Sequence, residues 1–140
     1  MPHLFSPYVL KDVTLRNRIV MSPMTMYRSV DGCMTDFHVM LMGSRAAGGF
    51  GLVFPEQIAI RPDGRTSVSC AGIWDDAQIV SLARVTRIIK DMGADVTPTF
   101  HPAATRDRPV LSRMSAVEAT GGFKPARCFS SSAAKAAGVA

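Results

Sequence analysis

The sequence predicts an α/β fold whose strands run parallel, and three observations lead to this fold class. Two apolar runs, Ile19–Met21 and Gly51–Ile60, have the length and composition of buried strands. Each run is followed by a segment in which apolar residues recur at helical spacing. A third strand is expected to start at Asp95. Strands that alternate with helices in this way form parallel sheets with right-handed crossover connections.

The N-terminal residues predict a small β-hairpin ahead of the first buried strand. Leu4–Leu10 and Lys11–Leu15 have the pattern of two short strands, with Lys11-Asp12 at the turn. The buried strand that follows ends at Pro23, because proline has no backbone N–H to donate to a neighbouring strand. The residues beyond Pro23 are therefore expected to face something other than another strand.

Local signals set the bounds of two helices. Thr35 is expected to cap the N-terminus of a helix that ends before Gly48-Gly49. Asp75 and Gln78 have the spacing of a capping box, and the helix that follows is expected to end at Gly93.

Two architectures of parallel strands compete, a closed barrel and an open doubly wound sheet. An open sheet would favour a glycine-rich, phosphate-binding turn directly after the first strand, and Ser22-Pro-Met-Thr25 is not such a turn. The barrel is therefore preferred, and a (β/α)8 TIM barrel takes about 250 residues. The fold class expected is an incomplete (β/α)8 TIM barrel: an N-terminal hairpin, about two and a half βα units in residues 1–98, and an irregular, disordered tail in residues 99–140.

Composition excludes several classes of function. The net charge of +5 divides into +1 for residues 1–98 and +4 for residues 99–140, and the basic tail has no interleaved aromatic residues or recognition motif. Nucleic-acid binding is therefore not expected. No apolar run is long enough to span a membrane, and the three widely spaced cysteines fit neither a disulfide framework nor a metal site. We expect a cytoplasmic protein with free thiols.

Many residues at collinear spacing carry a resemblance to one family. These segments lie within residues 4–94: Leu4-Phe5-Ser-Pro, Leu15-Arg-Asn-Arg-Ile-Val, Ser22-Pro-Met, Thr35-Asp36, Gly43-Ser-Arg45, Gly48-Gly-Phe-Gly-Leu52, Glu56, Gly64-Arg65 and Gly72-Ile-Trp-Asp75. Through them the chain resembles the N-terminal part of the old yellow enzyme family, the FMN-dependent NADH:flavin oxidoreductases with a (β/α)8 barrel.

The resemblance implies a cofactor site. Pro23, Met24 and Thr25 match the segment that lies against the flavin at the end of the first barrel strand, where the residue at the position of Thr25 could tune the flavin's reduction potential. Gln57 matches a small residue whose backbone contacts the flavin, and its larger side chain is a departure. Tyr27 matches a tyrosine that lines the substrate side in one branch of the family. No metal ligand is implied.

Each of these residues also has a purely structural interpretation. Thr25 could be a strand-end hydroxyl bonded to its own backbone, and Tyr27 a half-buried aromatic residue with a solvated hydroxyl. His38 is expected at the surface or in helix packing, and Arg45 and Trp74 are expected to be structural.

The residues after Ala94 depart from the family pattern. Relatives carry Ile-Gln-Leu-x-His-Ala-Gly-Arg on the third strand, and its glutamine bonds the pyrimidine edge of the flavin. Thr99, beside Pro98, stands nearest to that glutamine, and His101 is out of register and expected in an exposed loop. A frameshift is one hypothesis, because codons for Phe-His-Pro-Ala read one base out of frame can encode Ser-Ile-Gln-Leu. A natural divergent tail is the alternative; the coding DNA decides, since absence of the motif from both other frames would exclude a frameshift.

The resemblance implies a reaction in which NAD(P)H reduces FMN and the reduced flavin reduces an activated alkene such as an enone. The phosphate site, the substrate-anchoring pair and the proton-donating tyrosine belong to later strands of the family's barrel, so this chain is expected to be inactive by itself. Two non-catalytic functions remain open: a barrel remnant that binds another protein through its uncovered sheet, and a basic-tailed interaction module.

Overall fold

The computed structural model describes residue 1, residues 3–100, and residues 113, 116 and 117. The tail expected at 99–140 therefore lies almost wholly outside the described residues, as does His101. Within the described part of the chain, no helix is long and apolar enough to cross a membrane.

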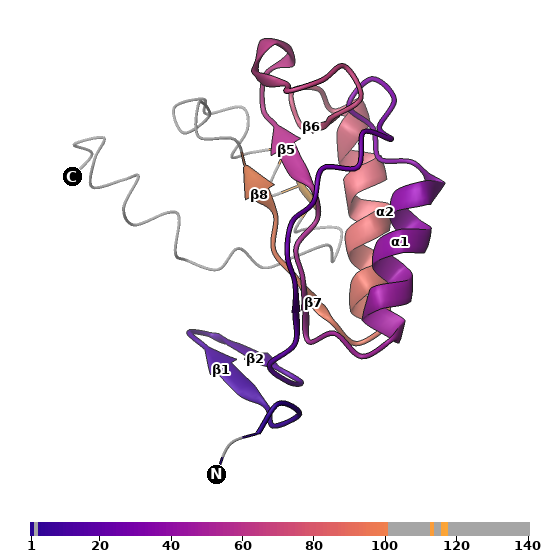
Figure 1. Ribbon diagram of the computed structural model, residues 1–140. Helices are drawn as coiled ribbons and strands as arrows, with labels where there is room; N and C mark the ends of the chain where they lie inside the picture. The colour runs from indigo at the N-terminus through magenta and orange to yellow at the C-terminus, as the bar shows by residue number, and fades with distance from the viewer. Residues whose placement is uncertain (2, 101–112, 114–115, 118–140) are drawn as a thin grey trace, which may run out of the picture.

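The N-terminal hairpin is present as expected. Strand β1 (Tyr8–Leu10) pairs antiparallel with β2 (Val13–Leu15), with Tyr8 opposite Leu15. Lys11 lies in the turn at a φ of 54°. Figure 1 shows the hairpin at one end of the molecule, below the parallel strands.

The remaining strands are parallel, which confirms the α/β class. One three-stranded ladder has the order β3 (Val20–Met21), β4 (Leu52–Val53), β7 (Asp95–Val96). The other has the order β6 (Ala71–Gly72), β5 (Gln57–Ala59), β8 (Thr99–Phe100). The described residues form an open α/β layer and no closed barrel.

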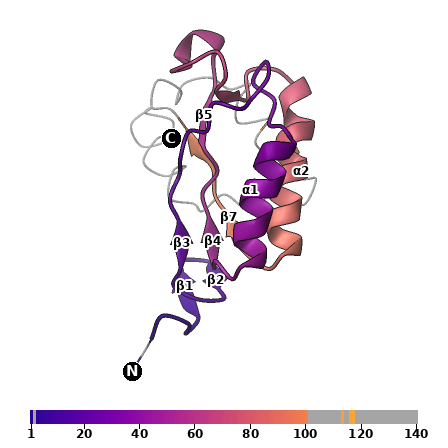
Figure 2. The same cartoon turned by 45° about the vertical axis from the view of Figure 1, so that its right-hand side comes forward.

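Two helices cover one face of these strands (Figures 1 and 2). Helix α1 (Asp36–Ala47) has Thr35 as its N-cap, as predicted. Helix α2 (Ala77–Asp91) follows the predicted capping pair, in which the Asp75 N–H donates to Gln78 Oε1 at 3.0 Å. The 3-10 turn η1 (Pro62–Gly64) lies in the loop between β5 and β6.

The second strand was expected to be continuous from Gly51 to Ile60, and this prediction is wrong. It is divided into β4 and β5, because Pro55 has no N–H to continue the ladder. Pro98 divides the third strand into β7 and β8 in the same way. Strand pairing thus continues two residues past residue 98, the boundary expected between barrel and tail; that division of the chain stays a prediction.

The two divided strands differ in length by one residue. Val53 pairs with Val96, and Gln57 pairs with Thr99. The three residues 54–56 therefore lie opposite the two residues 97–98. The second strand thus carries one extra residue, as in a β-bulge. The extra residue changes which side chains face the helices. Before it, the odd-numbered Val53 packs in the core, and after it the even-numbered Ile58 does so.

The hydrophobic core fills the space between the helices and the strands. Helix α1 supplies Met42 and Ala46, α2 supplies Val85 and Ile89, and the strands supply side chains including Val53, all of them almost fully buried. Burial of this apolar surface is the main force that holds the helices on the sheet.

Arg16 and Asn17 form hydrogen bonds with backbone at and just after the C-termini of α1 and α2. Arg16 donates hydrogen bonds to the backbone carbonyls of Ala46, of Phe50 at 2.8 and 3.1 Å, and of Met92 at 3.1 Å. The adjacent Asn17 is buried; its Nδ2 donates to the Gly49 carbonyl at 2.7 Å and its Oδ1 accepts from the Ile19 N–H at 3.0 Å. Of these carbonyls, that of Ala46 lies in the last turn of α1, that of Met92 is at the C-cap of α2, and those of Gly49 and Phe50 lie in the loop after α1.

We predict that Asn17→Ala lowers the free energy of unfolding by about 2 kcal/mol, because it leaves a part-buried carbonyl and a part-buried N–H without their side-chain partner. Urea denaturation followed by circular dichroism measures the change. The control is Thr14→Ala at an exposed hairpin position, which should change the free energy by less than about 0.5 kcal/mol. Equal stability of the two variants would contradict a role for Asn17 in holding the loop.

Candidate functional site

The residues predicted to face a cofactor lie together at the carboxyl end of the strands. Pro23, Met24 and Thr25 follow β3, and Gln57 is the first residue of β5. Met24 is 48% exposed and Thr25 is half-buried, so neither is absorbed into the core. Active sites of α/β barrels are built at this end of the strands.

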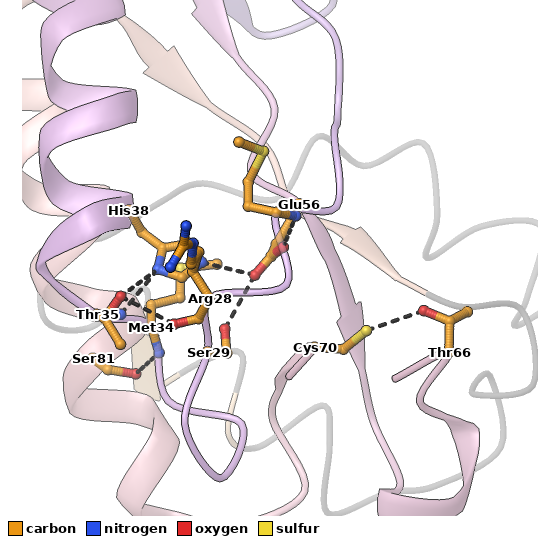
Figure 3. Close-up of polar contacts among 10 residues, drawn as sticks. Arg28, Ser29, Met34, Thr35, His38, Glu56, Thr66, Cys70 and Ser81 are labelled. Carbon is orange, nitrogen blue, oxygen red and sulfur yellow. Dashed lines mark hydrogen bonds and ion pairs between the residues drawn. The ribbon is translucent and has the colours of Figure 1, made fainter. Parts of the chain in front are cut away.

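The carboxylate of Glu56 holds this region together (Figure 3). Its side chain is fully buried. Oε2 accepts a hydrogen bond from the Met26 N–H at 2.7 Å, and Oε1 accepts from Ser29 Oγ at 3.1 Å and from His38 Nε2 at 2.8 Å. One side chain from the segment between β4 and β5 therefore fixes the loop that follows β3.

His38 is fully buried, which excludes the first of its two expected placements, at the surface, and leaves the second, in helix packing. It lies in the first turn of α1, where its Nδ1 accepts a hydrogen bond from the Thr35 N–H at 2.9 Å. A backbone N–H can only donate, so Nδ1 carries no proton and the imidazole is neutral, with its proton on Nε2. His38 therefore donates to Glu56 and presents no positive charge to the carboxylate.

Tyr27 lies within the turn that Glu56 closes. Its φ of 55° is in the left-handed region, which is uncommon for a bulky residue other than glycine. The bonds from Met26 and Ser29 to the same carboxylate lie on either side of it and hold this conformation. The Tyr27 side chain is 56% exposed.

Glu56 is ionised in this environment. Burial raises the pKa of its carboxyl group, but the hydrogen bonds from His38, Met26 and Ser29 outweigh burial and bring the pKa below the ordinary value of 4.5. The result is a buried anion stabilised by hydrogen-bond donors.

Gln57 and Thr99 lie side by side beyond this anchor. They are paired residues of β5 and β8, so their side chains lie on the same face of the sheet. Gln57 Nε2 and Thr99 Oγ1 are both buried and have no hydrogen-bond partner. Buried polar atoms in proteins nearly always have partners, so these two atoms need an explanation.

The pairing of His38 with Glu56 was not predicted from the sequence. Thr35 and His38 have the spacing of a capping box, but a histidine in place of the usual glutamate or glutamine did not stand out. Arg45, which was expected to be structural, is exposed on α1. The ring of Trp74 lies against Gly72 and Gly32, where a β-carbon at either position would collide with it. Within the described residues, no group of three or more potential ligands is placed to hold a metal ion.

The family is established by comparison with known proteins. Residues 3–121 match the model of the NADH:flavin oxidoreductase / NADH oxidase family. The chain therefore belongs to this family of FMN-dependent, NADH-using oxidoreductases, and the match extends past Ala94, where the recognisable motifs end.

Solved structures of old yellow enzymes agree with this assignment. Morphinone reductase is 31% identical over 71% of this chain, with a TM-score of 0.66, and the chain covers 26% of that protein. The old yellow enzyme homologue from Zymomonas mobilis is 29% identical over 71% of this chain, with 28% of its own length covered and a TM-score of 0.65. Old Yellow Enzyme from Pichia sp. AKU4542 shares the fold over 91% of this chain at 19% identity, with 38% of its own length covered and a TM-score of 0.67. The chain thus spans about a quarter to two fifths of these structures.

The site residues fit the flavin that the family uses. Gln57 Nε2 and Thr99 Oγ1 are buried without partners, so both would be available for hydrogen bonds with the polar edge of a heterocyclic ring. Met24 adds an exposed apolar side chain near the same sheet edge, suited to the flat face of a ring. Gln57 and Thr99 would hold polar atoms of the ring, and Pro23 to Thr25 would lie against it.

We predict that Glu56→Gln lowers the free energy of unfolding at pH 7 by about 2–3 kcal/mol, because the amide NH2 group faces groups that themselves donate hydrogen bonds. Urea denaturation over a range of pH measures this change.

The pH dependence has a definite sign. Because the pKa of Glu56 is lowered by folding, its stabilising effect is present above pH 4.5 and is lost as the pH falls below that value. Glu56→Gln should therefore lose less stability than the wild type between pH 7 and pH 3. The control is Asp63→Asn at an exposed carboxylate, which should be close to wild type at pH 7; equal behaviour of the two variants would contradict the anchoring role.

Proposed function

We propose that this chain supplies the flavin-facing wall of an FMN-dependent NAD(P)H oxidoreductase that acts on activated alkenes. The observation that carries the proposal is the 2.7 Å bond from the Met26 N–H to Glu56. It joins the segment after the first strand to the end of the second, so Thr25 and Gln57 belong to one wall. Membership of the NADH:flavin oxidoreductase family supports FMN as the group that this wall faces.

Each residue has a distinct task in this proposal. Pro23 and Met24 support the flavin face, Thr25 contacts its polar edge and sets its reduction potential, and Tyr27 lines the substrate side. Bound FMN supplies the redox chemistry, which is hydride transfer from a nicotinamide to the alkene. The residues of the chain orient the ring and shield one side of it from water.

We also propose that the 140-residue chain has no turnover by itself. In the family that the chain resembles, the phosphate-binding loops and the substrate-anchoring side chains come from later strands. The chain covers only 26% of morphinone reductase. The grip on FMN would then come from contacts to the ring and not from contacts to the phosphate.

The exposed hairpin favours a second, non-catalytic function. Leu4, Phe5 and Val9 are 55%, 69% and 66% exposed, and such a patch is typical of a surface that packs against other protein. As a non-catalytic barrel remnant, the chain would use this surface to bind a protein partner.

We predict that the purified chain binds FMN and riboflavin with dissociation constants that agree within about threefold, because both ligands offer the same ring. Quenching of flavin fluorescence measures both affinities. Oxidation of NADH or NADPH in the presence of an enone should not exceed the rate with free FMN. Absence of flavin binding together with a cooperative thermal melt would contradict the flavin-wall proposal and support the protein-binding remnant.

A further inference from the structure

The loop that carries Tyr27 is held at its far end by a second set of contacts, which come from the N-terminal part of α2. Gln78 is 2% exposed, and its Nε2 donates a hydrogen bond to the backbone carbonyl of Asp31 at 3.0 Å. Three residues further along α2, Ser81 Oγ accepts a hydrogen bond from the Met34 N–H at 3.1 Å (Figure 3). One face of α2 therefore bonds to both ends of the turn at residues 31–34.

Both side chains also bond within α2, which fixes the direction in which they point. Gln78 Oε1 accepts a hydrogen bond from the Asp75 N–H at 3.0 Å, and Ser81 Oγ donates to the Gln78 backbone carbonyl at 2.9 Å. The Gln78 amide thus uses its oxygen to cap the helix and its nitrogen to hold the loop. Each side chain has one partner in the helix and one in the loop.

The turn between the two bonds fits closely against its surroundings. A β-carbon at Gly32 would lie 2.6 Å from Gln78 Nε2 and 2.6 Å from the ring of Trp74. On another side, the Gly32 carbonyl accepts a hydrogen bond from the Gly72 N–H of β6 at 2.9 Å. The turn therefore takes its position from α2, Trp74 and β6 together.

Strained backbone in this loop is held by anchors at two places. Tyr27 and Asp31 have φ values of 55° and 48°, in the left-handed region, although neither is glycine. Such conformations persist where the surrounding structure holds the chain firmly. Glu56 holds the residues on either side of Tyr27, and Gln78 holds the carbonyl of Asp31.

The two anchors are close together along the chain. Ser29 is bonded to Glu56, and only Val30 separates it from Asp31. A displacement of Asp31 would therefore pull on the bond between Ser29 and Glu56. That bond is one of those that keep Tyr27 in its conformation.

We infer that Gln78 and Ser81 are positioning residues for Tyr27, on which they act through the turn at residues 31–34. The inference rests on the proposed function, in which Tyr27 lines the substrate side of the flavin. It adds α2 to the elements that set the geometry of the site, so that the loop depends on two anchors and not on Glu56 alone.

The test is fluorine nuclear magnetic resonance of the full chain labelled with fluorotyrosine. The sequence has 2 tyrosines, so the label reports on Tyr27 at the site and on Tyr8 in the hairpin, and Tyr27→Phe assigns the two signals. Gln78→Glu keeps an oxygen for the helix cap and removes the donor to the loop, and Ser81→Ala removes the hydroxyl. Both variants should shift or broaden the Tyr27 signal and leave the Tyr8 signal in place.

Two controls accompany these variants. Ser81→Thr keeps the hydroxyl and should retain the wild-type signal of Tyr27. Val80→Ala changes a side chain of the same helix that is 74% exposed, and it should leave both signals unchanged. If Gln78→Glu does not fold, the comparison of Ser81→Ala with Ser81→Thr decides the question by itself.

The outcomes separate the inference from the proposed function. An unchanged Tyr27 signal in the variants would overturn the inference, as would an equal change at Tyr8, which indicates a general loss of structure. Addition of FMN to the wild type should shift the Tyr27 signal and not that of Tyr8. Absence of this shift, with Tyr27 still displaced in the variants, would contradict the proposed function and leave the positioning role of Gln78 and Ser81 intact.

Discussion

The extra residue in the second strand is the constraint on which the site depends. Pro55 and Pro98 interrupt two neighbouring strands, and the ladder resumes at Gln57 and Thr99 with one residue more on the second strand than on the third. Glu56 lies in the unpaired segment between the two ladders, and its carboxylate meets His38 of α1. Gln57, next in the chain, then lies on the opposite face. One bulge therefore gives two adjacent polar residues different tasks, an anchor inside the fold and a contact on the open face.

The anchor has physical properties that suit a rigid site. A buried carboxylate is costly unless hydrogen-bond donors surround it, and Glu56 has three, from Met26, Ser29 and His38. His38 belongs to a helix, and Met26 and Ser29 belong to the loop that carries Thr25 and Tyr27. The loop therefore takes its position from a strand and a helix, which are more rigid than the loop itself.

Local pattern was enough to predict the order of strands and helices. Thr35 and Asp75 identified the two helix starts, and the apolar runs identified the strands. The break at Pro55 could have been predicted from proline chemistry, because the same argument was applied correctly at Pro23. The register between the strands could not, since the bulge is defined only by pairing residues more than forty positions apart. The bond between His38 and Glu56 was missed for the same reason, because it depends on how α1 packs on the sheet.

The positions of Thr25 and Gln57 follow from contacts made entirely within the first hundred residues. The three groups that donate to Glu56 lie between Met26 and His38 in sequence. Arg16 and Asn17 bond to backbone near the C-terminal ends of both helices. The core that holds these units also includes Val117. The contacts that position the loop are therefore local, whereas a catalytic cavity also needs an opposite wall. In the proposed function, flavin orientation would depend on the anchor at Glu56, and catalytic turnover would depend on structure beyond it.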